Sequence, residues 1–326
     1  MFKSNISFAE EQLLSYLPKT GKYYEANRNY SEDRSNNNTT SLLSPFIRYR
    51  LISEEQVLEE VLKKYDLREC EKFIQEIYWR TYWKGWLEHR PSVYSDYLED
   101  RNKLIEEFGN KKFYLNAISG NTNLSFFNNW VNNLKENGYL HNHVRMWFAS
   151  IWIFTLNLPW QLGADFFMQH LLDGDPASNT LSWRWVAGIH TKGKNYLARK
   201  SNIEKYSNIK ISSNEILNET LRIGKEKGYK PQIYTHPLGT YGHSAGTTIG
   251  MWDSQGGVPF NGDFPMNYNT VYAIELNTKV FIEEWNKEIR VMLEEAGTFE
   301  ETGFRYVNGR QTKLILIGDQ RVHLGN

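Results

Sequence analysis

The stretch that organises the chain is LHNHVRMWFASIWIFTLNLPWQLGADFFMQHLLDGDPASNTLSWRWVAG, residues 140–188 of 326. It is dense in tryptophan, and a further tryptophan, Trp130, lies just upstream. Two sparse polar clusters interrupt the aromatic run, HNHVR at 141–145 and DGDPASN at 173–179. An apolar aromatic wall with a few fixed polar groups suits a planar, redox-active cofactor. The plainer interpretation, a large aromatic core with polar residues at its ends, fits the composition equally well.

Composition limits the class of protein. The chain is 40% hydrophobic and 15% aromatic, so it can bury a sizeable core, and its net charge of zero gives no bulk attraction to nucleic acid. Cys70 is the single cysteine, which excludes an intrachain disulfide. The N-terminus lacks the apolar segment of a signal peptide, and the apolar run 144–160 is too short and too interrupted to span a membrane. We expect a soluble cytoplasmic protein.

Hydrophobic periodicity predicts helices over most of the first 208 residues. A helix should follow Ser44-Pro45, because serine caps helices and proline suits the first helical turn. The other helices expected in this region are 8–16, 54–64, 70–88, 97–108, 126–135, 144–156 and 162–172. No alternating strand pattern occurs before about residue 209, so the first part is predicted to be all-α.

The pattern then changes. A last charged helix is expected over 214–227, and short β-rich runs punctuated by Gly, Pro and Asn follow it. These runs are 232–235, 247–252, 270–280, 288–293, 304–307 and 312–317. A helical region followed by a β-rich one predicts a multidomain α and α+β protein, with domains at 1–208 and 209–326. The boundary should lie near Tyr206–Ser213.

Four sequence blocks in the first part, taken together in their order and spacing, indicate a family resemblance. They are TSLLSPFIRYR (40–50), FIQEIYWRTYWKGW (73–86), LHNHVRM (140–146) and DGDPASNTLSWRW (173–185). Over residues 8–206 the chain resembles the FAD-binding helical domain of the DNA photolyase/cryptochrome family. The resemblance implies bound FAD and light-driven electron transfer from reduced flavin to a flipped-out pyrimidine dimer in DNA. The family's α/β antenna domain is missing, so no antenna chromophore is expected.

The resemblance implies that one loop holds the FAD phosphates. Its hydroxyls and N–H groups at a predicted helix N-terminus form a ready anion site. The loop residues are Thr40, Ser41, Leu42, Leu43 and Ser44, and Tyr24 and Arg28 match the family's residues just before it.

A second set lies on one helix face, at positions i, i+3 and i+4: Glu76, Trp79 and Arg80. By resemblance, Glu76 and Trp79 line the pocket for the flipped-out dimer, where aromatic walls suit an unstacked base, and Arg80 faces the cofactor.

The resemblance also assigns roles around the flavin ring. Asn142 matches the residue that bridges cofactor and lesion. Arg145 and Asp173 match an ion pair beside the isoalloxazine, where a fixed positive charge favours the reduced, anionic flavin. Asp175 matches a carboxylate at the polar edge of the ring. Asn179 matches the residue facing N5, and because photolyases typically carry asparagine there, it favours repair over light sensing.

Three tryptophans complete the resemblance. Trp183 and Trp160 match two members of the family's electron-transfer chain, and Trp185 matches the aromatic residue that stacks on the lesion. The third, surface member of the chain is not assigned, and the candidates are Trp83, Trp86 and Trp130.

Some positions depart from the family pattern. His143 stands where an arginine is usual, and TNLSFF (122–127) replaces a TGYP-type segment. The stretch 184–205 has six Lys/Arg and one opposing Glu, and it suits either phosphate contacts or an ordinary solvated surface.

The segment THPLGTYGHSAGTTIGMWDSQGGVPFNGDFPMNYNTVYAIELN (235–277) resembles a different family. It is similar to the C-terminal half of the pita-bread metallopeptidases of the proline aminopeptidase/creatinase group, over about residues 213–318. This implies His236, Glu275 and either Glu294 or Glu295 as ligands of divalent Mn, Zn or Co, with His243 on the substrate side. That family needs two upstream aspartates, and no Asp occurs between residues 209 and 235. We therefore predict an incomplete, inactive peptidase site.

Both similarities are cut near the same point, which indicates a fusion of two fragments, natural or from sequence assembly. The leading hypothesis is a photolyase-like, FAD-dependent lyase acting on DNA with pyrimidine dimers. One alternative is a cryptochrome-type light sensor without repair activity. The other is an aminopeptidase-like, metal-dependent hydrolase from the C-terminal part.

Overall fold

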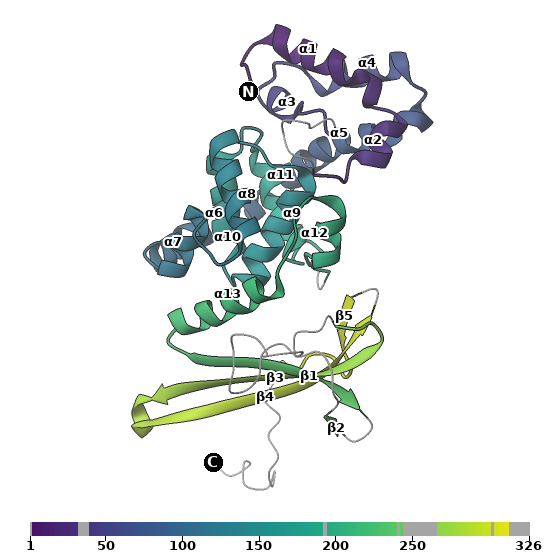
Figure 1. The fold of residues 1–326 in the computed structure, drawn as a ribbon. Coiled ribbons are helices and arrows are strands. Elements are labelled where there is room, and N and C mark those ends of the chain that lie inside the picture. The colour runs from purple at the N-terminus through teal and green to yellow at the C-terminus, as the bar shows by residue number, and fades with distance from the viewer. Residues whose placement is uncertain are drawn as a thin grey trace. The chain divides into compact units, whose positions relative to one another are not determined.

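A computed structural model describes residues 2–31, 39–191, 194–239, 242–243, 266–300 and 303–312 (Figure 1). The chain divides into two compact units, Met1–Thr220 and Leu221–Asn326. The division falls inside helix α13 (Ser213–Glu226), slightly beyond the boundary expected from the sequence. Among the described helices, none has the length and apolar character needed to cross a membrane.

The first half of the helical unit is built from short helices around one small core. They are α1 (Ile6–Tyr16), η1 (Leu17–Lys19), α2 (Lys22–Asn27), α3 (Ser44–Arg48), α4 (Glu54–Lys64) and α5 (Leu67–Glu88). Ser53 and Gln56 form a reciprocal capping box that starts α4 at the predicted residue. Val57 and Val61 of α4 are buried with Cys70 and Phe73 of α5, so the two helices share one core.

The loop before α3 has an unusual backbone. Leu42 has φ = 55°, in the left-handed region that non-glycine residues rarely adopt. The turn brings Leu43 into the core, and Ser41 Oγ lies 3.4 Å from the backbone nitrogen of Leu43. Ser44 and Pro45 then begin α3, as the sequence predicted.

The second half carries the aromatic core. Its helices are α6 (Pro91–Phe108), α7 (Lys112–Ser119), α8 (Ser125–Asn137), α9 (Asn142–Ser150), η3 (Ile151–Thr155), α10 (Trp160–His170), α11 (Pro176–Val186) and α12 (Lys200–Tyr206). Trp147, Phe148 and Trp152 are fully buried, so this part of the tryptophan-rich stretch is core, as the plainer interpretation held. The predicted helix 144–156 changes at Ile151 into one wider π-helical turn.

The C-terminal unit is one antiparallel sheet with strand order β2-β1-β3-β4-β5 (Figure 1). The strands are β1 (Lys230–Gly239), β2 (Gly242–His243), β3 (Thr270–Ile282), β4 (Lys287–Glu300) and β5 (Gly303–Tyr306). A turn of 3-10 helix, η4 (Glu283–Trp285), and Asn286 at φ = 48° connect β3 to β4. The predicted strand at 247–252 and most of that at 312–317 lie outside the described residues. A small sheet of this kind does not by itself identify a pita-bread half-domain.

Candidate functional site

A cavity of about 690 Å³ opens in the helical unit, lined by residues of α2 to α5 and of α9 to α11. This volume lies within the range typical of small-molecule and cofactor sites. Most of the residues predicted to hold the cofactor or the lesion line it. They are Tyr24, Ser41, Leu43, Ser44, Glu76, Trp79, Arg80, Asn142, Arg145, Asp173, Asp175, Asn179, Trp183 and Trp185.

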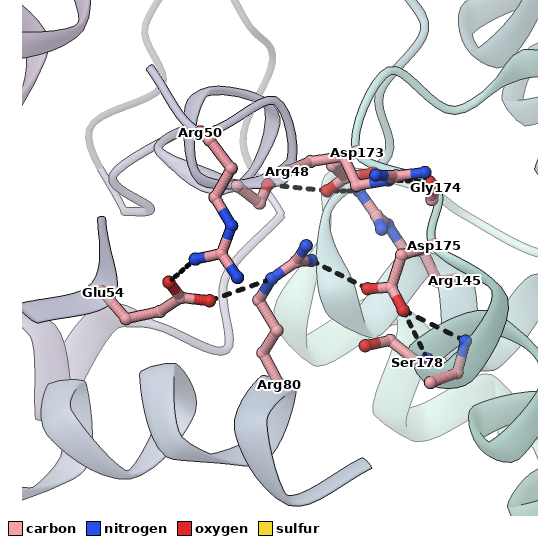
Figure 2. Close-up of polar contacts among 11 residues, drawn as sticks. Arg48, Arg50, Glu54, Arg80, Arg145, Asp173, Gly174, Asp175 and Ser178 are labelled. Carbon is pink, nitrogen blue, oxygen red and sulfur yellow. Dashed lines mark hydrogen bonds and ion pairs between the residues drawn. The ribbon is translucent and has the colours of Figure 1, made fainter. Parts of the chain in front are cut away.

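The loop Asp173-Gly174-Asp175 is the polar centre of the cavity (Figure 2). Asp175 caps α11, because its Oδ1 accepts hydrogen bonds from the backbone N–H groups of Ala177 (3.1 Å) and Ser178 (3.0 Å). Its Oδ2 pairs with Nη1 of Arg80 at 2.8 Å, and Arg80 Nε lies 3.3 Å from Glu54. One carboxylate thus orders a helix start and fixes an arginine from α5 beside the cavity.

Asp173 makes a second set of contacts on the other side of the loop. Its Oδ2 accepts hydrogen bonds from Ser44 Oγ (2.6 Å) and from Arg145 Nη2 (2.8 Å). Burial works to lower the pKa of Arg145, but Asp173 and Tyr139 outweigh it and raise that pKa above its usual value. The guanidinium therefore stays charged next to the cavity. Arg48 Nε also donates to the carbonyl of Gly174 at 2.6 Å, so the loop is bound to α3 twice (Figure 2).

The mouth of the cavity is aromatic. Trp79 is 49% exposed and stacks on Trp83 with ring centroids 5.5 Å apart. Trp185 is 37% exposed and stacks on Tyr196 at 5.7 Å. Flat, accessible indole faces at an opening suit an unstacked nucleobase.

Deeper in the cavity the side chains are fixed by packing. Asn179 donates from Nδ2 to the carbonyl of Ala164 at 2.8 Å, which sets the orientation of its amide. Trp183 is 2% exposed and packs edge-to-face on Phe167 at 5.1 Å. A Cβ added at Gly163 would come within 2.3 Å of the Trp183 ring, so glycine permits this close packing of α10 on α11.

Four predicted site residues lie outside the cavity lining. Arg28 forms an ion pair with Glu76, which does line the cavity. Thr40 and Leu42 belong to the strained loop before α3, and Trp160 stacks on Tyr97 of α6 at 5.4 Å. Their contact with the cavity is therefore indirect in this structure.

Several buried polar atoms have no hydrogen-bond partner among the described residues. They include Arg80 Nη2, Asp173 Oδ1, Ser178 Oγ and His190 Nδ1, whose residues line the cavity, and Thr40 Oγ1 in the loop before α3. An unsatisfied buried donor or acceptor costs about 1–3 kcal/mol, so we expect bound water or a ligand to satisfy these atoms. Both donors and an acceptor are represented, which fits a ligand with phosphate and amide-like edges.

The histidines beside Asn142 are held neutral. Burial, then the neighbouring His143, lowers the pKa of His141 to about 4, and His141 Nδ1 accepts from the backbone N–H of His143 at 3.1 Å. Burial also lowers the pKa of His143, whose Nδ1 lies 2.9 Å from the carbonyl of Asn29. A neutral imidazole therefore occupies the position where the resemblance led us to expect an arginine.

Sequence reasoning missed two groups in this network. Ser178 lies inside the block DGDPASN but carried no separate signal. Glu54 had none either, because an acidic residue in the first turn of a helix is common. Its role depends on α4 packing beside α5, which brings it within 3.3 Å of Arg80.

The sheet unit brings together part of the predicted metal site. His236 Nε2 lies 3.0 Å from Glu275 Oε1, and Tyr234 donates a hydrogen bond to Glu275. Glu294 stands opposite Glu275 on β4, while Glu295 accepts from the backbone N–H of Gln311. The side chain of His243 lies outside the described atoms. Across the described residues, no group of three or more His, Cys, Asp or Glu side chains is placed to hold a metal ion.

Comparison with known proteins points to one family for the helical unit. Residues 73–212 match the family model of the FAD binding domain of DNA photolyase. A deoxyribodipyrimidine photo-lyase from Buchnera aphidicola subsp. Baizongia pistaciae is 31% identical over 185 residues, which is 54% of this chain and 38% of that protein. One from Streptomyces griseus is 31% identical over 153 residues, 47% of this chain and 33% of that protein. The chain thus spans well under half the length of these relatives.

Solved structures show the same fold. A bacterial class III photolyase from Agrobacterium tumefaciens superposes with a TM-score of 0.52 at 24% identity, over 68% of this chain and 45% of that one. A cryptochrome from Synechocystis gives a TM-score of 0.52 at 22% identity, over 63% and 44%. The metallopeptidase resemblance gains no support from these comparisons. Residues 73–212 are thus similar to the FAD binding domain of DNA photolyase, and the helical unit shares the fold of these solved structures.

Proposed function

We propose that the helical unit binds FAD in the cavity and serves a light-driven photolyase reaction on pyrimidine dimers in DNA. The observation that carries the proposal is the gathering of the resemblance-assigned residues around one cavity of about 690 Å³. The relatives named deoxyribodipyrimidine photo-lyase support it. This chain spans only part of the length of these relatives. We therefore propose the activity from the cavity residues as well as from the similarity.

The residues present fit FAD. Ser41 and Ser44 at the start of α3, with Arg80, would hold the phosphates, and Arg80 Nη2 is a buried donor still without a partner among the described residues. The Arg145–Asp173 pair and Asp175 would face the flavin ring, whose carbonyl and N–H groups match a guanidinium and a carboxylate. When bound, FAD supplies photochemical electron transfer, which the side chains of this protein cannot perform alone.

The remaining groups would act on the substrate. Trp79 and Trp185 offer exposed indole faces for the bases of a flipped-out dimer. Glu76 is oriented by its ion pair with Arg28, and Asn142 lines the cavity at the first turn of α9. Trp183 would donate electrons from within the wall, because its buried ring lines the same cavity.

The test combines a spectrum with a repair assay. The purified protein should show visible flavin absorption after incubation with FAD, and light should restore pyrimidines in DNA containing dimers. Trp79→Ala should weaken binding of dimer-containing DNA by roughly 5- to 150-fold, since one base–aromatic stack contributes about 1–3 kcal/mol. Trp285→Ala, in the sheet unit, is the matched control and should have no effect, because Trp285 is exposed far along the chain from the cavity residues.

The outcomes separate the alternatives. A protein that stays colourless with FAD refutes the proposal. Flavin photoreduction that depends on Trp183 but brings no repair would instead indicate a cryptochrome-type light sensor. Of repair and light sensing, Asn179 in the cavity wall favours repair, because photolyases typically carry asparagine at this position.

For the sheet unit we propose a non-catalytic remnant of a metallopeptidase half-domain. We place the boundary between the two domains near residue 208. His236 beside Glu275, with Glu294 across the strand pair, supports the remnant. A single histidine and two carboxylates lack the further ligands that two-metal hydrolysis uses. Elemental analysis should find no stoichiometric Mn, Zn or Co, and an X-Pro dipeptide should not be cleaved. Stoichiometric metal with peptidase turnover would contradict this.

A further inference from the structure

The surface end of the electron path, left unassigned by the sequence, has a structural candidate in α6. The ring of Trp160 stacks on that of Tyr97, with centroids 5.4 Å apart and an interplanar angle of 26°. The ring of Tyr94 follows at 5.7 Å from Tyr97. Tyr97 is buried, whereas Tyr94 lines an open groove of about 420 Å³ with Pro91 and Lys84. Contacting rings therefore lead from Trp160 to a solvent-accessible surface.

The two rings have different charged neighbours. The guanidinium carbon of Arg184 lies 5.9 Å from the centroid of Trp160, and a cation there disfavours a positive charge on the indole. Tyr97 has the carboxylate of Asp165 and the guanidinium of Arg101 as charged neighbours, and these two pair with each other at 3.3 Å. Burial, then Asp165, raises the pKa of Tyr97 above its usual value, so the phenol is protonated at neutral pH. Losing an electron, it must also lose that proton.

We propose that Tyr97 is the outer electron donor of this chain, in the place where the family pattern leads us to expect a tryptophan. Tyr97 gives one electron to oxidised Trp160 and its phenol proton to Asp165. Trp160 returns to its neutral form, and Tyr97 becomes a neutral tyrosyl radical. The proposal rests on the proposed function, because bound FAD would supply the photo-oxidant, and the family resemblance assigns Trp183 and Trp160 to the path between FAD and Tyr97.

A competing path exists in the same helices and supplies the control. Trp152 lies 6.3 Å from Trp183, and Tyr114 lies 6.2 Å from Trp152, with both pairs nearly perpendicular. Asp165 also raises the pKa of Tyr114, after burial. Tyr114 is thus, like Tyr97, a tyrosine near Asp165 whose ring contacts a tryptophan. Its tryptophan is Trp152, whereas that of Tyr97 is Trp160.

The experiment identifies the radical. FAD-loaded protein with ring-deuterated tyrosine is illuminated and frozen, and its electron paramagnetic resonance spectrum is compared with that of unlabelled protein. We expect a signal that narrows with the label in the wild type and in Tyr114→Phe. In Tyr97→Phe it should be lost and replaced by a tryptophan radical, and Asp165→Asn should slow its formation. Tyr97→Trp should give a tryptophan radical without loss of flavin photoreduction.

Two results overturn the inference: a wild-type radical insensitive to the tyrosine label, or loss of the tyrosine signal in Tyr114→Phe but not in Tyr97→Phe. Failure of FAD binding is seen separately, as absent visible absorption before illumination. In that case azide radicals, which oxidise indoles in solution, test the same variants in the cofactor-free protein. Intramolecular conversion of tryptophan radicals to tyrosine radicals should then fall in Tyr97→Phe and Trp160→Phe but not in Tyr114→Phe. Equal yields in all three variants would refute the relay.

Discussion

Asp175 performs two tasks that two substitutions can separate. Its Oδ1 caps α11, and its Oδ2 pairs with Arg80. The side chains of Asp175 and Arg80 are 3% and 13% exposed, so the pair is largely desolvated. Asp175→Ala removes the cap, which costs about 1 kcal/mol, and leaves a mostly buried guanidinium short of one partner. Breaking a buried pair costs about 3–5 kcal/mol, and because Glu54 still faces Arg80 we expect a total loss near the lower end, about 3–4 kcal/mol.

Asp175→Asn should behave differently. Asparagine caps helices about as well as aspartate, so the cap survives and only the charge-assisted bond is lost, about 1.5–3 kcal/mol. In urea denaturation followed by helical circular dichroism, a 3 kcal/mol loss at a slope of about 3 kcal/mol/M lowers the midpoint by about 1 M. The asparagine variant should fall between that value and the wild type.

A double-mutant cycle makes the test sharper. Asp175→Asn combined with Arg80→Gln should lose less than the sum of the single losses, by about 1 kcal/mol or more, because each single variant removes the same bond. Asp175→Ser in the Arg80→Gln background keeps a capping side chain and serves as the control. Equal losses in Asp175→Asn and Asp175→Ala would show that the cap contributes nothing. Additive losses in the cycle would show that the ion pair is not what the carboxylate contributes.

Three further predictions follow from local geometry. The pKa of His141 in the folded protein is about 4, below its usual 6.5, so between these pH values the unfolded chain binds more protons. The free energy of unfolding should therefore fall by about 3 kcal/mol as the pH drops from above 6.5 to 4. His141→Asn should remove that slope in pH-dependent melts, and an unchanged slope would contradict the assignment. Gly163→Ala should destabilise by about 1–3 kcal/mol and change the emission of Trp183, because the new Cβ meets that ring; an unaltered melt would be inconsistent with the close packing. Leu42→Gly should be neutral or gain up to about 1 kcal/mol, since φ = 55° strains leucine, whereas Leu42→Val should lose stability; the reverse order in urea melts would exclude strain there.

Helix prediction succeeded where the deciding signals are local. The predicted bounds 54–64 agree with α4, because Ser53 and Gln56 cap its start within three residues. Helix α11 was not predicted, because it is buried on several sides and so lacks an amphipathic stripe. Helix α6 was expected from Tyr97 but begins at Pro91, where proline fits the first turn.

The site depended on a different kind of information. Ser44 and Asp173 are 129 positions apart, and nothing in spacing or periodicity predicts their hydrogen bond. Only the ordered resemblance placed them together. The same stretch also contains core residues: Trp147 and Trp152 are buried within the aromatic core, whereas Trp183 faces the cavity, and composition alone does not distinguish them.

The unsatisfied polar atoms around the cavity couple the folding of the helical unit to its ligand. Arg80 Nη2 and Asp173 Oδ1 come from the two halves of this unit, and both are buried. A ligand that bonds to both atoms would hold the two halves together. The free energy of unfolding would then rise with the concentration of that ligand. At about 100 times its dissociation constant it adds about 2.7 kcal/mol to the free energy of unfolding. For the FAD proposed as this ligand, cofactor supply during synthesis would then set how much of the chain survives proteolysis.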